Sequence, residues 1–346
     1  MADYYRHGKR ATDAPACDGA KGKVMAAKKA TMKEVAAAAN VTAQTVSRVF
    51  SGSGYVAKET RARVLEEAER LNYIPNRVAA TLRTGKAKSI AVIFDSLKNF
   101  YFAVMIDYIQ REAQERGYGL QTVLVNSHTI TDDIYCNAVS SGVCAVISFL
   151  EVDSIVAESI RRFGVPLTVF GRRSDIKEVD YITTDDVRGG RMVAARLLER
   201  GCKRFVYMAE GFGMSCVRDR YEGYSSALAE HGFTTDVVGC YNVKESLASY
   251  LYDHPVPDGI FCMSDMTAFA VLKELKKYEG GENALVVGYD DISSDVVLPI
   301  DLTSVGIDKS AYVKHVVTRI LEKAESGSSD RITEKAEVRL HIGETA

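Results

Sequence analysis

The chain has 346 residues, of which 47% are apolar and 26% are charged, and its formal net charge is −2. This length predicts two or three domains, and this composition is typical of a folded globular protein rather than a disordered or fibrous one. No apolar stretch is long enough to span a membrane, and the seven scattered cysteines include no Cys-x-x-Cys pair. We therefore expect no disulfides, structural zinc or membrane partner, and we place the protein in a reducing cytoplasm.

The first 30 residues show no hydrophobic periodicity and hold seven Lys or Arg side chains against three Asp side chains. We interpret residues 1–30 as a disordered basic tail rather than an export signal. This tail carries a formal charge of +4 and residues 31–88 carry +5, so the remaining residues must carry −11. A basic module joined to an acidic body is the charge pattern of a nucleic-acid-binding protein whose larger part has another role.

A helix, a tight turn and a second helix are predicted after this tail. Thr31 and Glu34 have the spacing of a reciprocal helix cap, and Thr42 can cap a second helix whose apolar residues recur at helical spacing. Gln44 and Arg48 lie on the other face of that second helix. Their side chains can read adenine and guanine edges in the major groove of DNA, and the alternative is that both are merely solvated.

A third amphipathic helix leads into a segment that ends it and begins another. Pro75 ends the third helix and Asn76 can cap a new one. The following segment, residues 77–83, is too short to be a stable helix by itself in water. We therefore expect it to become helical only when another surface supports it.

Residues 31–88 resemble the headpiece and hinge of the lactose-repressor (LacI/GalR) family of bacterial transcription regulators, most specifically in the motifs TVSRV at 45–49 and YIPN at 73–76. In that family the hinge helix forms on operator DNA, pairs with its counterpart in the dimer and wedges a leucine into the minor groove. Leu82 stands at that position, and the alternative is a packing residue in a linker. The resemblance implies DNA contacts by Thr31, Thr42, Ala43, Gln44, Thr45, Ser47, Arg48, Asn76, Arg77, Ala79 and Leu82.

From Ser89 on, apolar strands alternate with amphipathic helices, which predicts two doubly wound parallel sheets. The first half is expected to hold strands at 90–94, 120–125, 143–147 and 167–170, and helices near 101–116, 132–140 and 153–163. The second half is expected to hold strands at 204–208, 237–240, 259–263 and 285–289, and helices near 186–200, 217–231, 244–253 and 266–278. The chain is expected to cross between the halves near 185, 292 and 302–305, and to return a helix at 309–325 to the first half. Ligands of such sheets bind at the carboxyl ends of the strands, which predicts a cleft between the halves.

This part of the chain also resembles the effector domain of the same family, which has the fold of periplasmic sugar-binding proteins. The motifs RDRYEGY at 218–224 and VVGYDD at 286–291 carry the resemblance. It implies effector contacts by Phe100, Tyr101, Arg172, Arg220, Tyr241, Ser264 and Asp290. Asp290 and Arg220 match positions that hydrogen-bond the ligand, although they could instead form an ion pair between the halves. The aromatic residues could be packing rather than stacking residues.

Three departures from the family pattern concern the ligand. Ser264 stands where many members carry Asn, Ile307 stands where Gln is common, and Phe100 replaces the usual Pro. A pocket without those amides has fewer donors for a hexose. The effector could therefore be a sugar, a sugar phosphate or a nucleoside, or the pocket could be degenerate.

Enzymatic readings find little support in the sequence. Gly211 and Gly213 resemble the start of a dinucleotide fingerprint, but position 216 is Cys and the loop does not open the sheet. There is no Gly-x-Ser-x-Gly elbow, Walker lysine or His-Glu-x-x-His motif, and the six histidines are isolated. We therefore expect no catalytic residue, no metal and no cofactor.

The sequence and its resemblance to this family thus predict a homodimeric, cytoplasmic (nucleoid-associated) transcription regulator. We expect a repressor that binds double-stranded operator DNA under the control of a small molecule. The alternative is a free-standing sugar-binding protein, which would need an export signal and no headpiece.

The expected fold is a small all-α helix-turn-helix headpiece with a hinge helix, followed by an α/β effector domain like periplasmic binding proteins. The expected bounds are 1–30 for the tail, 31–75 for the helix-turn-helix domain, 76–88 for the hinge and linker, and 89–346 for the effector domain, with an N-subdomain at about 89–184 and 308–330 and a C-subdomain at about 186–301.

Overall fold

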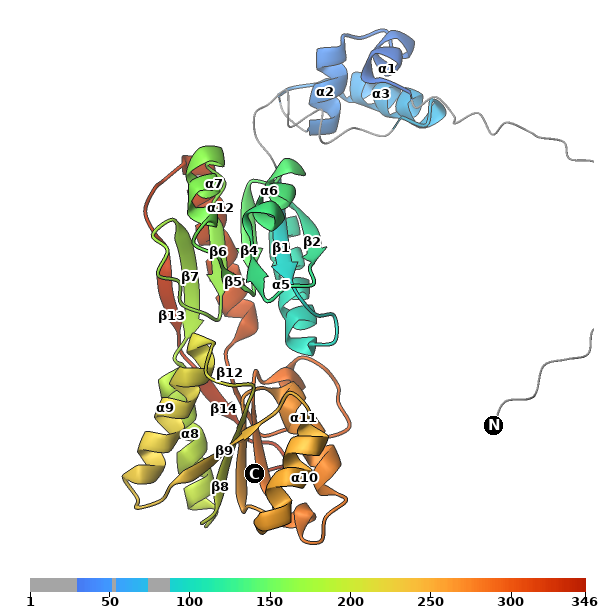
Figure 1. The fold of residues 1–346 in the computed structure, drawn as a ribbon. Helices are drawn as coiled ribbons and strands as arrows, with labels where there is room; N and C mark the ends of the chain where they lie inside the picture. Colours follow the sequence, from blue (N-terminus) through green and yellow to red (C-terminus); the bar gives the residue numbers. More distant parts are fainter. Residues whose placement is uncertain (1–29, 52–53, 74–87) are drawn as a thin grey trace, which may run out of the picture. The chain divides into compact units, whose positions relative to one another are not determined.

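The computed structural model describes residues 30–51, 54–73 and 88–346. The chain divides into two compact units, one up to Ala79 and the other from Ala80 on. The described part of the first unit contains three helices, α1 (Met32–Ala38), α2 (Ala43–Ser51) and α3 (Lys58–Arg70). These confirm the predicted helix pair and third helix (Figure 1). The tail up to residue 29 and residues 76–87 of the predicted hinge lie outside the described residues.

The caps predicted for the first two helices are present. The Thr31 hydroxyl accepts from the backbone N–H of Glu34 at 3.3 Å, and the Glu34 carboxylate accepts from the backbone N–H of Thr31 at 2.6 Å. Asn40 has the left-handed backbone conformation at φ 54°, which turns the chain between the helices. The Thr42 hydroxyl then accepts from the Thr45 N–H at 3.1 Å and begins α2.

A valine-rich core holds the three helices together. Val35, Val46, Val49 and Val64 are all buried in it. The small size of this unit limits how much apolar surface it can bury. Hydrogen bonds between the helices therefore contribute to its stability.

Two arginines of α3 form such hydrogen bonds. Arg61 donates to the Val49 carbonyl at 3.1 Å, and Arg63 donates to the Ala39 carbonyl at 2.9 Å. These carbonyls belong to the last turn of α2 and the cap of α1, where no intrahelical donor is left for them. Two of the cations that we counted toward nucleic-acid binding therefore also hold the unit together.

The first sheet of the second unit has six parallel strands in the order β13-β7-β6-β4-β1-β2. The strands are β1 (Ser89–Phe94), β2 (Gly119–Leu124), β4 (Ala145–Ser148), β6 (Leu167–Phe170), β7 (Val179–Thr184) and β13 (Thr333–Ala336). Two helices cover one face, α5 (Phe100–Glu115) and α12 (Lys309–Ser326), and two cover the other, α6 (Asp132–Ser140) and α7 (Val156–Phe163). Alternate β1 residues enter the two cores, Ile90 and Val92 on one side and Ala91 and Ile93 on the other, as buried parallel strands require. A short pair, β3 (Thr129–Ile130) with β5 (Glu151–Val152), lies beside it.

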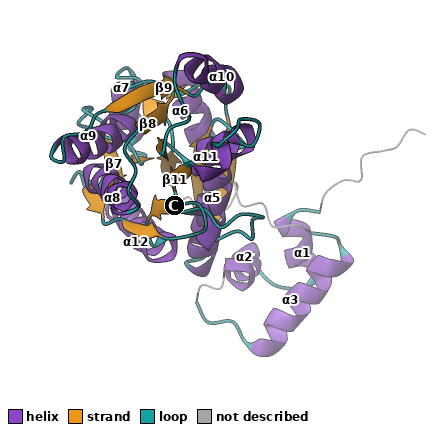
Figure 2. Ribbon diagram, turned by 90° about the horizontal axis from the view of Figure 1, so that it is seen from below, coloured by secondary structure: helices purple, strands orange, loops and turns teal. Residues whose placement is uncertain are grey.

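The second sheet has the order β14-β12-β11-β10-β8-β9 and is parallel except for β14. Its strands are β8 (Phe205–Ala209), β9 (Thr235–Gly239), β10 (Gly259–Cys262), β11 (Leu285–Tyr289), β12 (Ser304–Gly306) and β14 (Arg339–His341). The helices α8 (Asp186–Glu199) and α9 (Ser215–Ala229) cover one face, and α10 (Val243–Asp253) and α11 (Asp265–Leu275) cover the other. The end-on view shows helices surrounding the strands of this unit (Figure 2). Both doubly wound halves are therefore confirmed.

The crossings between the halves differ from the prediction. The chain crosses at about 185 as expected, but it crosses next between β12 and α12, and last between β13 and β14. The crossing predicted near 292 is wrong, because 3-10 turn η2 (Ile292–Ser294) leads back to β12, which pairs with β11 in the same sheet. The second half thus extends beyond the expected limit of 301 and includes β14. The strands β7, β13 and β14 were not predicted, since each takes its place from pairing with distant residues.

Candidate functional site

The second helix of the first unit presents a polar face. Val46 and Val49 of α2 are buried, whereas Gln44 and Arg48, four residues apart, are exposed side by side on the same face. Ser47 is half-buried. The polar face is therefore the one that the sequence predicted, and its shape and donors suit the edges of base pairs in a major groove.

The other predicted DNA contacts fall into three groups. Thr31, Thr42 and Thr45 are engaged in the caps described above, with Thr31 and Thr42 exposed and Thr45 half-buried. Ala43 packs partly against the core of the unit, so only part of its surface is free for an apolar contact. The remaining four lie outside the described residues: Asn76, Arg77, Ala79 and Leu82.

A cavity of about 690 Å³ lies between the two halves of the second unit, at the carboxyl ends of the strands of both sheets. It is lined by six of the seven predicted effector residues, namely Tyr101, Arg172, Arg220, Tyr241, Ser264 and Asp290. Phe100 does not line it. Asn99 caps α5 through the backbone N–H of Tyr101, and the helical turn carries Phe100 to the surface, where its side chain is 44% exposed.

Arg220 is held on the wall of the cavity by residues of its own half. Its Nε donates to the Asp186 carboxylate at 2.9 Å, its Nη1 donates to the Met263 carbonyl, and its guanidinium lies 3.6 Å from the centre of the Tyr289 ring. Arg220 thus forms no ion pair with Asp290. Its partner Asp186 begins α8 in the same half, so the alternative of an ion pair between the halves does not apply to this arginine.

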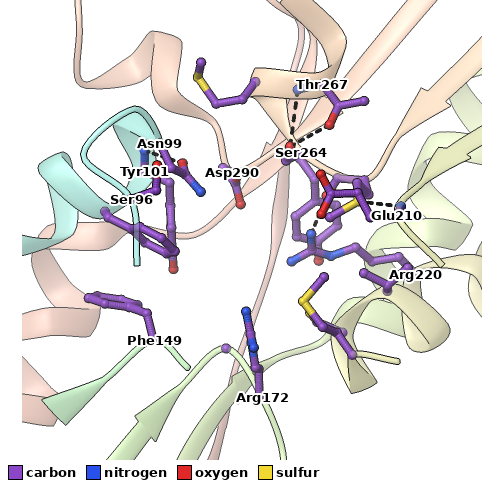
Figure 3. A pocket seen from close by; sticks show the side chains of 18 of the residues that line it. Ser96, Asn99, Tyr101, Phe149, Arg172, Glu210, Arg220, Ser264, Thr267 and Asp290 are labelled. Atoms are coloured by element: carbon purple, nitrogen blue, oxygen red, sulfur yellow. Dashed lines mark hydrogen bonds between the residues drawn. The ribbon is translucent and has the colours of Figure 1, made fainter. Parts of the chain in front are cut away.

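Asp290 occupies a strained position at the end of β11. Its backbone has φ of 122°, a region that L-residues rarely adopt, while its N–H donates to the Val305 carbonyl at 2.7 Å. The carboxyl group points into the cavity (Figure 3), and burial raises its pKa to about 8. Asp290 is therefore mostly protonated at neutral pH and presents a hydrogen-bond donor as well as an acceptor.

The other predicted residues have different positions in the cavity. Arg172 follows β6 and points toward the cavity centre, and Tyr101 faces it from the start of α5 (Figure 3). The Ser264 hydroxyl caps α11 by accepting from the Thr267 N–H at 3.3 Å. Tyr241 is 82% exposed at the rim, so it does not stack deep in the cavity.

Several lining residues were not singled out in the sequence. Phe149 directly follows β4 and Glu210 directly follows β8, and both face the cavity (Figure 3). The rule that ligands bind beyond the carboxyl ends of parallel strands identifies both residues once the strand ends are known. Asp186, which holds Arg220, could be found only from the contact between α8 and α9.

The described residues offer neither a cluster of metal ligands nor a membrane-spanning helix. In that part of the chain no group of three or more His, Cys, Asp or Glu side chains is arranged to hold a metal ion. None of its helices is long and apolar enough to cross a membrane.

The comparisons with known proteins agree with this architecture. Residues 31–76 match the family described as bacterial regulatory proteins, lacI family, and residues 194–346 match the periplasmic binding protein-like domain. The chain thus carries a lacI-family helix-turn-helix domain and a periplasmic binding protein-like domain. The first match corresponds to α1–α3, and the second covers most of the second half together with α12 and β13 of the first half.

Curated relatives cover most of the chain. The HTH-type transcriptional repressor PurR of Pasteurella multocida (strain Pm70) is 27% identical over 318 residues, which cover 87% of this chain and 94% of that protein. The ribose operon repressor of Halalkalibacterium halodurans is 27% identical over 304 residues, covering 85% and 89%. Among solved structures, the Lac repressor dimer bound to operator and the anti-inducer ONPF has a TM-score of 0.75 at 22% identity, with 92% and 99% coverage. The transcriptional regulator CelR in complex with cellobiose has a TM-score of 0.65 at 25% identity, with 92% and 100% coverage.

Proposed function

We propose that this regulator is a repressor that binds near-palindromic operator DNA as a homodimer and whose DNA affinity is set by a small molecule in the cavity of the second unit. One observation carries the proposal. The same chain joins a helix pair with Gln44 and Arg48 exposed on one face to a two-lobed unit with a polar-lined cavity. We place its action in the cytoplasm, on nucleoid DNA. The repressors among its relatives support the direction of control.

The effector acts by changing the angle between the two halves. The first half begins at β1, directly after the linker from the DNA-binding unit, and three chain crossings join it to the second half. A ligand that contacts both halves favours one angle, and this angle raises or lowers the affinity of the chain for operator DNA. A coupling free energy of roughly 1 to 3 kcal/mol is enough for a 5- to 150-fold change in operator affinity. We propose a sugar, a sugar phosphate or a nucleoside as the effector class.

We assign no catalytic role to the cavity. Burial raises the pKa of the Cys216 thiol, and burial together with Glu210 raises that of Cys240 to about 12, so both thiols stay protonated and weakly nucleophilic. The Ser264 hydroxyl is engaged with the backbone and hydroxyl of Thr267. These groups favour ligand binding over turnover.

The test is selection of binding sites from a pool of random DNA duplexes by the full chain at physiological salt, followed by affinity measurements on the enriched sequence. We expect an enriched near-palindrome. Arg48→Ala should relax base preference at one position of each half-site by about 1 to 3 kcal/mol. Arg70→Ala is the matched control, because Arg70 is paired with Glu67 at the far end of α3.

The outcomes distinguish a sequence-specific regulator from a free-standing small-molecule binding protein. A uniform loss of affinity for every sequence in Arg48→Ala would assign Arg48 to phosphate rather than base contact. If no sequence is enriched with or without candidate small molecules, the chain is a small-molecule binding protein and the proposal fails.

A further inference from the structure

Two arginine side chains enter the cavity from opposite halves. Arg172 follows β6 of the first half, and Arg220 belongs to α9 of the second half. Both guanidinium groups lie near the cavity centre (Figure 3). An independent observation places them near one another: burial raises the pKa of the Cys216 thiol, and Arg220 and Arg172 both act to lower it. Both cations are therefore within electrostatic reach of the same sulfur atom.

The positive charge of these two arginines is only half balanced by protein groups. Arg220 is paired with Asp186, whereas Arg172 has no hydrogen-bond or ion-pair partner among the residues that the structure describes. Asp290, the acid nearest the cavity centre, is mostly protonated at neutral pH because burial raises its pKa to about 8. One cation therefore remains without a counter-charge in a site with aromatic walls.

The other acids of the cavity lie toward its mouth. Asp95 is held by His128 at 2.7 Å, and the side chains of Glu151 and Glu210 are exposed. Burial raises the pKa of Glu210, and the charges that act on it are those of His128 and Asp95 rather than those of the two arginines. None of these three acids forms an ion pair with Arg172.

We propose that the effector carries an anionic oxygen group, a carboxylate or a phosphate ester, and that this group bridges Arg172 and Arg220 when the cleft closes. Closure without a ligand brings two guanidinium groups together, and their repulsion opposes it. An oxyanion between them removes the repulsion and accepts charge-assisted hydrogen bonds from both halves. The group that is recognised is thus also the group that drives closure. This inference rests on the proposed effector role of the cavity.

The other residues of the cavity wall indicate the chemistry of the rest of the effector. The Tyr101 and Phe149 rings, with centroids 6.1 Å apart, form an aromatic surface on one side. The protonated Asp290 carboxyl can donate to a hydroxyl oxygen or accept from one. The cavity volume of about 690 Å³ admits a molecule of the size of a sugar acid, a sugar phosphate or a nucleotide.

The experiment compares neutral and anionic members of matched pairs with the full chain, by isothermal titration calorimetry and thermal shift. The pairs are glucose with gluconate, glucose with glucose 6-phosphate, ribose with ribose 5-phosphate, and adenosine with adenosine monophosphate. Inorganic phosphate and sulfate are measured alone. The carboxylate and phosphate arms distinguish the two possible sources of the oxyanion. We expect the anionic member of at least one pair to bind about tenfold or more tightly than its neutral partner.

Variants of the arginines decide whether the anion is recognised as proposed. Arg172→Gln should abolish the preference for the anionic member, and Arg172→Lys should restore part of it, since it returns the charge without the planar fork. Arg161→Gln is the control, because Arg161 lies on α7 outside the cavity and pairs with Glu178, so this variant should keep the preference.

Three outcomes would overturn the inference: neutral members that bind as tightly as their anionic partners, a preference that survives in Arg172→Gln, or a full chain that is stabilised by none of the anions, inorganic phosphate included. Each of these leaves the proposed function standing if the same preparation still selects an operator sequence.

Discussion

Asp290 combines an unfavourable backbone conformation with a carboxyl group that is costly to ionise. Burial raises its pKa from 3.8 to about 8. Arg220 and Lys309 act to lower this pKa, whereas Asp265 and Asp186 act to raise it further. A residue that is strained and desolvated in a cavity is not selected for stability. We therefore expect its replacement to stabilise the empty protein.

The expected pH dependence follows from this raised pKa. Between the pKa of the unfolded chain near 4 and the folded pKa of about 8, the folded protein binds more protons at Asp290, so stability falls as pH rises. Between pH 7 and 9 this site should cost the wild type about 1 kcal/mol, which corresponds to roughly 2 to 4 °C in Tm. Asp290→Asn removes the dependence and should have the higher Tm at pH 9. Parallel Tm profiles for the two proteins over this pH range would contradict the assignment.

At the scale of elements, the contact between α8 and α9 positions the arginine of the cavity. The two helices approach so closely that a Cβ atom at Gly190 would lie 2.1 Å from the Arg220 carbonyl oxygen. A Cβ atom at Gly223 would lie 1.9 Å from the Val187 carbonyl oxygen. Only glycine fits at these two positions. Because α8 carries Asp186 and α9 carries Arg220, this close approach brings the two charged groups into contact.

Gly190→Ala should therefore destabilise the second unit by about 1 to 3 kcal/mol, measured by chemical denaturation, and weaken ligand binding by moving Arg220. An alanine in a helix otherwise stabilises by up to about 1 kcal/mol relative to glycine, so the sign of the effect is diagnostic. The control is Gly239→Ala, since a Cβ atom there meets nothing within 4 Å. Equal stability of the two variants would show that the helices can separate without cost.

At the scale of the whole second unit, one carboxylate joins the two halves at a chain crossing. Asp295 follows β11 in the second half and accepts from the buried Lys309 ammonium at 2.7 Å. Its other oxygen accepts from the Tyr108 hydroxyl, on α5 of the first half, also at 2.7 Å. Lys309, the first residue of α12, additionally donates to the Asp291 carbonyl at 2.7 Å. Lys309 thus holds the start of α12 against the second half. Tyr108 of the first half is hydrogen-bonded directly to Asp295 of the second half.

Asp295→Ala should lower the free energy of unfolding by about 3 kcal/mol or more, because it removes the ion-pair partner of the buried Lys309 ammonium. Tyr108→Phe is the matched variant, since it removes only the hydrogen bond between the halves and should cost about 1 kcal/mol. Urea denaturation of both variants measures the two effects. Equal losses would mean that Lys309 does not depend on the carboxylate.

The sequence by itself determined the elements whose cause is local. The Thr31 and Thr42 caps, the exposed face of α2 and the alternation of buried strands with amphipathic helices depend on residues a few positions apart, and all were predicted. The strand ends also placed Arg172 and Asp290 in the cleft. The family motifs then supplied roles for these residues.

Only the tertiary structure decided the features that depend on distant partners. The strands β13 and β14 are short, and pairing with residues far along the chain, rather than periodicity, places them and β7 in their sheets. The same holds for the burial that raises the pKa of Asp290 and for the ion pair of Arg220 with Asp186. Burial and ion pairing depend on how elements pack in space, and a linear sequence does not contain those distances.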